Sequence, residues 1–295
     1  MSEAHLSPQT PLKPAINAWE IYLYDQGRSP NTVKAFLSDV HLLTEYLPPD
    51  RTLGVISTED LNGFLHWLEH DRGIPCSPKS LARRATAVKS FFRWLQKGGA
   101  IVVDPGEKVV QRSVLSPLPE VLSDAEMELT LLSADRYRRK ARPDAQPYTL
   151  LALLLQTGIK KSECLGIHIN HIDLDASEGP LVFIRYSSPE NRYKERKLLL
   201  SEDWVPAYEE YLTQYNPVDR LFAWSPRRLE YLLEDIGKDA GLNKHLSFDM
   251  CRWSCALVDY VNNVEHETIR QKLGISKIQW REIHLKLRQL ADMIK

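Results

Sequence analysis

Apolar residues recur at helical spacing through the N-terminal third of the chain. In residues 15–26 they lie three or four positions apart, which predicts an amphipathic helix. Three more helices are predicted after Ser29, Ser57 and Ser77, because a serine side chain accepts hydrogen bonds from the free N–H groups of a first helical turn. Four short helices with apolar faces predict a small bundle over residues 14–104.

The pattern changes twice in the rest of the chain. Residues 105–119 lack periodicity and contain three prolines, which predicts a linker. Residues 120–295 return to helical stripes, except that residues 181–200 alternate apolar and polar positions, which predicts a β-hairpin with a loose tip. The expected fold is therefore mainly α with a small β-sheet, in two domains.

Composition and length exclude several classes of protein. The chain has 295 residues, of which 43% are hydrophobic, enough for ordinary globular cores. It has no run of about 18 uncharged apolar residues that would span a membrane, and residues 1–14 lack the pattern of a secretory signal. The cysteines lack Cys-x-x-Cys spacing and indicate reduced thiols in a cytoplasmic protein. We expect no metal site, with zinc held by Cys251, Cys255 and a histidine as the alternative.

Basic residues cluster locally although the net charge is only −1. Residues 72–103 contain no Asp or Glu, and the fourth predicted helix carries its basic residues opposite its apolar stripe. A second cluster occupies residues 136–142. Because attraction to phosphates acts locally, both clusters are candidates for binding double-stranded DNA, and two solvated helix faces are the alternative. The candidate DNA-binding residues of the fourth helix are Lys79, Arg83, Arg84, Lys89 and Arg93.

Residues 150–165 carry a motif that resembles a known family. They read LLALLLQTGIKKSECL, which is similar to the first box of the tyrosine recombinase (phage integrase) family, an apolar helix followed by T-G-hydrophobic-R-x-S-E-x-L. Residues 19–23, 27–33 and 91–95 also fit the N-terminal domain of that family. The resemblance spans residues 14–290. It implies a four-helix, SAM-like core-binding domain, a linker, and a mainly helical catalytic-type domain that contains a small sheet.

The resemblance also assigns the positions at which members of the family cleave a DNA strand. Members use a tyrosine that attacks the scissile phosphate, two arginines that hold this phosphate, a hairpin lysine that donates a proton, and histidines. The second box of this chain reads DMCRW over residues 249–253 and keeps one of the arginines. The positions that correspond to the catalytic residues are Lys160, Asn191, Asp249, Arg252, Ile275 and His284.

These substitutions predict that the site still binds a phosphate but does not hold it in the precise geometry that cleavage requires. Lys160 keeps a positive charge but lacks the planar fork of arginine, whereas Arg252 can still bind a phosphate. Asn191 cannot donate a proton at neutral pH, and Arg192 or Lys194 of the same hairpin are the alternatives. The hairpin residues that we expect to contact DNA are Lys194 and Arg196.

The position of the nucleophile decides the predicted activity. His284 stands nine residues after Ile275, where the family has its tyrosine, and residues 261–295 contain no tyrosine. A phosphohistidine is the alternative to a histidine without a chemical role. Ile275 has no polar group, and Asp249 would repel a phosphate, so we expect Asp249 to cap the helix that begins there. Because such residues act as a unit, their joint replacement predicts that cleavage is lost.

The leading hypothesis is a DNA-binding protein of this family that does not cleave DNA and that regulates or assists an active recombinase. The alternatives are a divergent active recombinase, using His284 or a tyrosine from another subunit, and a protein-interaction scaffold that no longer binds DNA. The resemblance implies no cofactor. It also implies that the apolar stripe of residues 285–295 mediates self-association or pairing with an active recombinase. Folding of this tail onto its own domain is the alternative.

Overall fold

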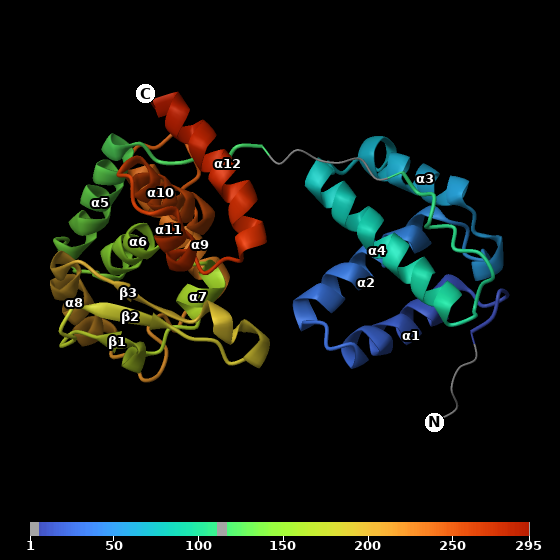
Figure 1. The fold of residues 1–295 in the computed structure, drawn as a ribbon, viewed down its shortest axis with the longest axis horizontal. Helices are drawn as coiled ribbons and strands as arrows, with labels where there is room; N and C mark the ends of the chain where they lie inside the picture. Colours follow the sequence, from blue (N-terminus) through green and yellow to red (C-terminus); the bar gives the residue numbers. More distant parts are fainter. Residues whose placement is uncertain (1–5, 111–116, 295) are drawn as a thin grey trace. The chain divides into compact units, whose positions relative to one another are not determined.

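The chain divides into two compact units, Met1–Pro117 and Leu118–Lys295 (Figure 1). The structure is a computed structural model that describes residues 6–110 and 117–294. The prediction of a mainly helical protein with a small β-sheet is confirmed. Within the described ranges, no helix is both long enough and apolar enough to cross a membrane.

In the described part of the first unit, four amphipathic helices surround one apolar core. They are α1 (Leu12–Asp25), α2 (Pro30–Tyr46), α3 (Thr58–His66) and α4 (Pro78–Lys97). Trp19 of α1 is fully buried and lies against Phe36 of α2 and Phe91 of α4. The three predicted serine caps are confirmed, since each serine side chain accepts a hydrogen bond from the N–H group three residues later. A 3₁₀ turn (Leu53–Val55) and a π-helical turn (Trp67–Asp71) flank α3.

A buried carboxylate joins α2 to α4. Asp39 is 2% exposed, is hydrogen-bonded to Arg83, and lies 3.7 Å from Nε of Arg84. Burial raises the pKa of Asp39, and the charges of the two guanidinium groups oppose that rise. The carboxylate therefore depends on both arginines to remain charged inside the unit.

This arrangement corrects the prediction that every basic residue of α4 faces outward. Arg84 and Lys89 are half-buried, whereas Lys79, Arg83 and Arg93 are exposed. Arg84 turns inward toward Asp39, and Lys89 donates to a backbone carbonyl of the segment that follows α4. The prediction failed because these partners lie far away in the sequence.

Part of the predicted linker packs against the first unit. Val109 is buried in its core, and the hydroxyl of Thr58 donates to the carbonyl of Pro105 at 2.9 Å. Residues 105–110 therefore belong to this unit, because the chain after α4 finds hydrogen-bond partners there. Residues 111–116 of the predicted linker lie outside the described residues.

The second unit combines helices with one antiparallel sheet of strand order β1-β2-β3. Its helices are α5 (Asp124–Arg138), α6 (Gln146–Thr157), α7 (Lys161–Leu165), α8 (Val205–Tyr215), α9 (Pro226–Asp239), α10 (Phe248–Val261), α11 (His266–Lys272) and α12 (Lys277–Ile294). Its strands are β1 (Ile172–Asp173), β2 (Leu181–Ile184) and β3 (Arg196–Leu199). The β2–β3 pairing confirms the predicted hairpin, with Ile184 opposite Arg196. The sequence did not predict β1, because two residues are too few to show an alternation.

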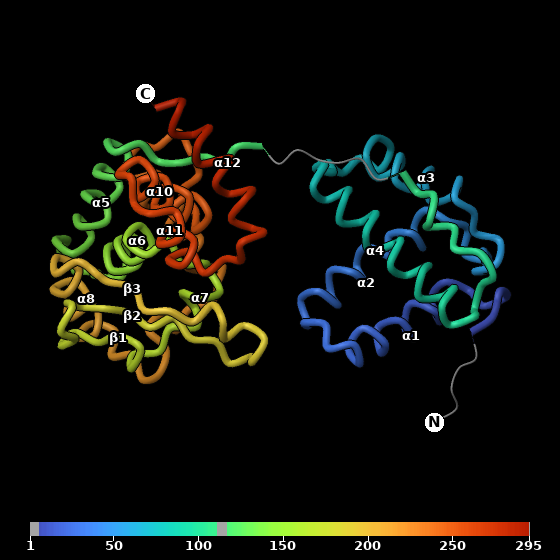
Figure 2. The backbone as a smooth tube through the Cα atoms, in the orientation of Figure 1, coloured from blue at the N-terminus to red at the C-terminus, as the bar shows by residue number. Residues whose placement is uncertain are grey.

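Helices α6 and α10 lie at the centre of this unit, with α5 on one side and α12 on the other (Figure 2). Almost every residue of α6 is buried, in agreement with its apolar sequence on all faces. Helix α12 rests on α10 and buries Leu287 and Leu290, while Leu285 and Met293 stay exposed. The tail thus packs onto its own domain in this structure, and pairing with another subunit through its exposed residues stays a prediction.

We predict that Asp39→Asn lowers the free energy of unfolding by about 2 kcal/mol, because Arg84 loses its carboxylate partner while half-buried. Equilibrium urea unfolding of the full chain measures this change. Asp25→Asn is the matched control, since Asp25 is exposed at the end of α1, and it should change stability by less than about 0.5 kcal/mol. Equal effects of the two substitutions would contradict the role given to Asp39.

Candidate phosphate-binding site

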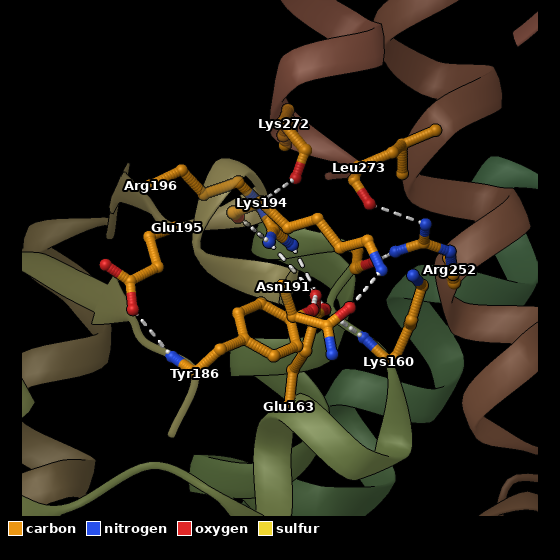
Figure 3. Close-up of polar contacts among 11 residues, drawn as sticks. Lys160, Glu163, Tyr186, Asn191, Lys194, Glu195, Arg196, Arg252, Lys272 and Leu273 are labelled. Carbon is orange, nitrogen blue, oxygen red and sulfur yellow. Dashed lines mark hydrogen bonds and ion pairs between the residues drawn. The ribbon is translucent and has the colours of Figure 1, made fainter. Parts of the chain in front are cut away.

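Arg252 on α10 ties together the ends of two other helices. Its guanidinium donates to the carbonyl of Gly158, which ends α6, and to the carbonyl of Leu273, which ends α11, the latter at 2.7 Å (Figure 3). Burial lowers the pKa of Arg252, yet an arginine remains charged at physiological pH. A cation is therefore held at a fixed point where three segments meet.

The turn at Gly158 brings Lys160 to the same place. Gly158 has a φ of 60°, and a side chain there would meet Cys255 and Leu273 at 3.2 Å, so the turn requires glycine. The backbone N–H of Lys160 donates to the carboxylate of Glu163 at 2.8 Å. This hydrogen bond caps the N-terminus of α7. The turn formed by the sequence Thr-Gly-Ile-Lys thus determines the position from which the side chain of Lys160 extends.

Lys160 is surrounded mainly by positive charge. Burial lowers its pKa, the charge of Glu163 opposes this shift, and the charges of Arg252 and Lys194 lower the pKa further. Within the described ranges, Lys160, Lys194 and Arg252 form no ion pair with a carboxylate. Three cations that are not ion-paired with a carboxylate form a site suited to an anion, although the charge of Glu163 also acts on Lys160 and Arg252.

A buried ion pair between Glu163 and Arg196 braces this site. Their side chains are 1% and 9% exposed, and Arg196 donates to both carboxylate oxygens, at 3.0 and 3.1 Å. Arg196 also donates to the carbonyls of Lys194 and Lys272, at 3.0 and 2.7 Å, while Tyr186 donates to Glu163. Burial alone would raise the pKa of Glu163, but Arg196 holds it below its usual range. The pair joins α7, the hairpin and α11 (Figure 3).

The prediction that Arg196 contacts DNA is contradicted by this geometry. All three guanidinium nitrogens of Arg196 are bonded inside the protein. The backbone of Gly274, with a φ of 58°, passes so close that a side chain there would meet Nη1 of Arg196 at 2.5 Å. Arg196 is therefore a structural residue that fits under the Leu273-Gly274 turn.

The hairpin tip contributes Lys194. The ammonium of Lys194 donates to the side-chain oxygen of Asn191 at 2.6 Å and points toward Lys160 and Arg252 (Figure 3). Of the hairpin residues that the sequence offered, Lys194 is the cation that the structure brings to the site, and Arg192 is exposed.

A groove of about 700 Å³ opens beside these cations between α7, α9 and the start of α10. Lys160 and Arg252 line one part of it, and Asp249 is exposed on its rim. The prediction that Asp249 caps α10 is wrong, because Ser247 is the capping residue and accepts from the N–H of Met250. Asp249 instead lies in the first turn, where an acidic residue interacts favourably with the helix dipole.

His284 lies in an aromatic cluster with Tyr260, His266 and Trp280. The ring centre of His284 lies 4.5 Å from that of His266 and 5.7 Å from those of Tyr260 and Trp280. Burial lowers the pKa of His284, and the neighbouring His266 lowers it further. His284 is therefore a packing residue of α12 in this structure. Ile275 is also buried, as its apolar side chain led us to expect.

The second basic cluster is separate from this site. It begins in the last turn of α5, and this end of the helix lies at the opposite end of the unit from the hairpin tip (Figure 1). Arg138 is bound by Asp135 and Glu210, and Arg139 is bound by Asp135. Lys140 lies over the ring of Tyr137. Part of this cluster thus balances the acidic residues of its own unit.

The residues that hold the cations of the site in place carry no local signal in the sequence. Glu163 stood inside the recognised motif, but its partner Arg196 is 33 positions later, so nothing local showed the pair. Tyr186 gave no signal, because an aromatic residue after a strand is ordinarily a packing residue. Cys251 and Cys255 are buried free thiols, and the described residues contain no group of three or more side chains placed to hold a metal ion.

Comparison with known proteins decides the family. Residues 16–99 match the model of the phage integrase N-terminal SAM-like domain, and residues 121–285 match the model of the phage integrase family. The chain belongs to the phage integrase family.

Relatives of this integrase-family chain are distant. Tyrosine recombinase XerD of Listeria innocua is 25% identical over 289 residues, covering 92% of this chain and 94% of XerD. Tyrosine recombinase XerC of Roseiflexus castenholzii is 32% identical over 162 residues, covering 52% and 48%. The structure of XerH site-specific recombinase bound to palindromic difH substrate matches with a TM-score of 0.74 at 18% identity, covering 98% and 90%. A lambda integrase dimer bound to a COC′ core site matches with a TM-score of 0.72 at 14% identity, covering 93% and 77%. The two structures show a shared fold.

We predict that Gly274→Ala is more destabilising than Gly241→Ala. Both glycines have a positive φ, so each substitution costs about 1 kcal/mol in backbone strain. A side chain at position 241 would meet nothing within 4 Å, whereas one at position 274 displaces Arg196 and breaks its bonds. The expected difference in the free energy of unfolding is about 2 kcal/mol. Thermal or urea unfolding measures it, and two equal losses would contradict the close packing.

We predict that Glu163→Gln costs about 3 kcal/mol of stability at pH 7, because Arg196 then stays buried without a charged partner. The folded-state pKa of Glu163 is lowered, so its contribution is complete above the usual value of 4.5 and is lost as the pH falls through the folded-state pKa. Unfolding measured between pH 7 and pH 3 should show the two proteins converging at the acidic end. A stability difference that stays constant would argue against the ion pair.

Proposed function

We propose that this protein binds double-stranded DNA through phosphate contacts and does not cleave the strand by a phosphotyrosine route. One observation carries the proposal. The cations Lys160, Lys194 and Arg252 share one site and, among the described residues, none of them is ion-paired with a carboxylate, while the family position for the nucleophile holds His284 in an aromatic cluster. The site thus has the charge to hold a phosphate, but the family position for the attacking phenol carries an imidazole.

Several features support duplex DNA as the ligand. Structures with the same fold include XerH bound to difH substrate and a lambda integrase dimer bound to a COC′ core site. Lys160 and Lys194 supply compact ammonium charges, and Arg252 supplies a planar guanidinium, which are the groups that bind phosphates in proteins. In the first unit, Lys79 and Arg93 are exposed on α4 and supply further candidate contacts, and Arg83 is exposed as well but is bonded to Asp39.

The chemistry of the remaining groups argues against cleavage. A phosphotyrosine intermediate requires a phenol in line with the phosphate, and residues 261–295 contain no tyrosine. Lys160 cannot provide the two-pronged hold of an arginine on the transition state. Because these groups act together, one surviving arginine does not restore the rate. A regulator or architectural partner of an active recombinase is the role that fits a protein which binds DNA and leaves it intact.

We predict that the affinity of the full chain for a duplex falls steeply as salt rises, because each neutralised phosphate releases about 0.9 counter-ions. Lys160→Ala should lower the log–log slope by about one, whereas Lys197→Ala should leave it unchanged, since Lys197 is exposed and already paired with Glu178. Fluorescence anisotropy with a labelled duplex measures both. Absence of binding at low salt would favour a protein-interaction scaffold instead.

We also predict no covalent adduct when the protein is mixed with a randomised pool of nicked duplexes and run on a denaturing gel. The pool removes the need to know a target sequence. An adduct that forms with the wild-type chain and disappears in His284→Ala would refute the proposal and establish a phosphohistidine route.

A further inference from the structure

The hairpin tip is a 3₁₀ helix, and this geometry determines which of its side chains reach the site. The helix spans Pro189–Lys194. A 3₁₀ helix has three residues per turn, so side chains three positions apart point the same way. Asn191 and Lys194 are separated by three positions. A lysine at position 194 can therefore reach the region that a residue at position 191 faces.

The contacts at the tip hold Lys194 in that direction. The side-chain nitrogen of Asn191 donates to Ser188 at 2.8 Å, which turns its oxygen toward the ammonium of Lys194, 2.6 Å away. The ammonium also lies 5.1 Å from the ring centre of Tyr193 and 5.9 Å from that of Tyr186. Ring faces attract cations without neutralising them. Lys194 is thus half-buried and oriented, and none of the contacts described for its ammonium is with a carboxylate.

Two other cations of the hairpin are bonded to groups of the protein, and a third is exposed to solvent. Arg196 is bonded to Glu163 and to two carbonyls, and Lys197 is paired with Glu178. Arg192 is exposed. The side chain of Lys194 differs from these, because its ammonium points toward Lys160 and the guanidinium of Arg252 (Figure 3).

We propose that Lys194 is the hairpin cation that contacts the phosphodiester of a bound duplex and that Asn191 is its positioning residue. The resemblance places the lysine of the family at about position 191, so in this chain the cation has moved by one turn of the 3₁₀ helix. The proposal rests on the proposed function, since it names a residue of the same phosphate-binding site. It assigns no proton transfer to Lys194.

The test measures duplex affinity and its salt dependence for the full-length chain with a fluorescein-labelled duplex. Lys194→Ala should weaken binding roughly tenfold at low salt and lower the log–log slope by about one. Asn191→Ala should weaken binding by a smaller factor, about threefold, because the ammonium remains but is no longer held. The double variant Asn191→Lys/Lys194→Ala should recover most of the loss, since a lysine at position 191 returns a charge on the same side of the helix.

The control is Lys197→Ala, which removes an exposed lysine of the same hairpin and should change affinity less than twofold. If the wild type binds with a steep salt dependence while Lys194→Ala behaves like Lys197→Ala, the assignment of Lys194 is wrong and the proposed function stands. If the double variant binds no better than Lys194→Ala, the one-turn displacement is wrong. If the wild type does not bind a duplex, the proposed function fails and the assignment fails with it.

Discussion

The buried ion pair between Glu163 and Arg196 is the interaction on which the candidate site depends. It joins a short helix to a hairpin, and Arg196 also binds the carbonyl of Lys272 at the end of α11. A buried pair is costly to form and more costly to break. The ion pair positions the site, because Glu163 accepts from the backbone N–H of Lys160 and Arg196 donates to the carbonyl of Lys194. Gly274 is part of the same constraint, since only its bare backbone fits over Arg196.

Binding and chemistry separate in this structure because they use different groups. The anion site needs positive charge at a fixed place, and cations on three elements supply it. Cleavage needs an attacking oxygen as well, and the corresponding position on α12 carries an imidazole packed among aromatic rings. Under the proposed function, this member of the phage integrase family keeps the first property and has lost the second. The buried brace explains why the geometry persists, since it also serves stability.

Local signals in the sequence predicted the fold well. Serine caps, the glycine after α6 and the alternation in the hairpin act over a few residues, and each matches the structure. The errors concern side chains whose partners lie far away in sequence. Arg84 turns to Asp39 and Arg196 turns to Glu163, which no spacing rule reveals. Lys194 was only one alternative for the hairpin cation, because the sequence did not show that the tip is a 3₁₀ helix.

A crystal structure of the full chain with a duplex tests the central claim most directly. The account predicts a backbone phosphate within hydrogen-bond distance of Lys160, Lys194 and Arg252, the Glu163–Arg196 pair unchanged beneath them, and both DNA strands intact beside α12. A duplex bound elsewhere on the surface, with this site empty, would contradict the claim. A strand joined covalently to the protein would contradict it as well.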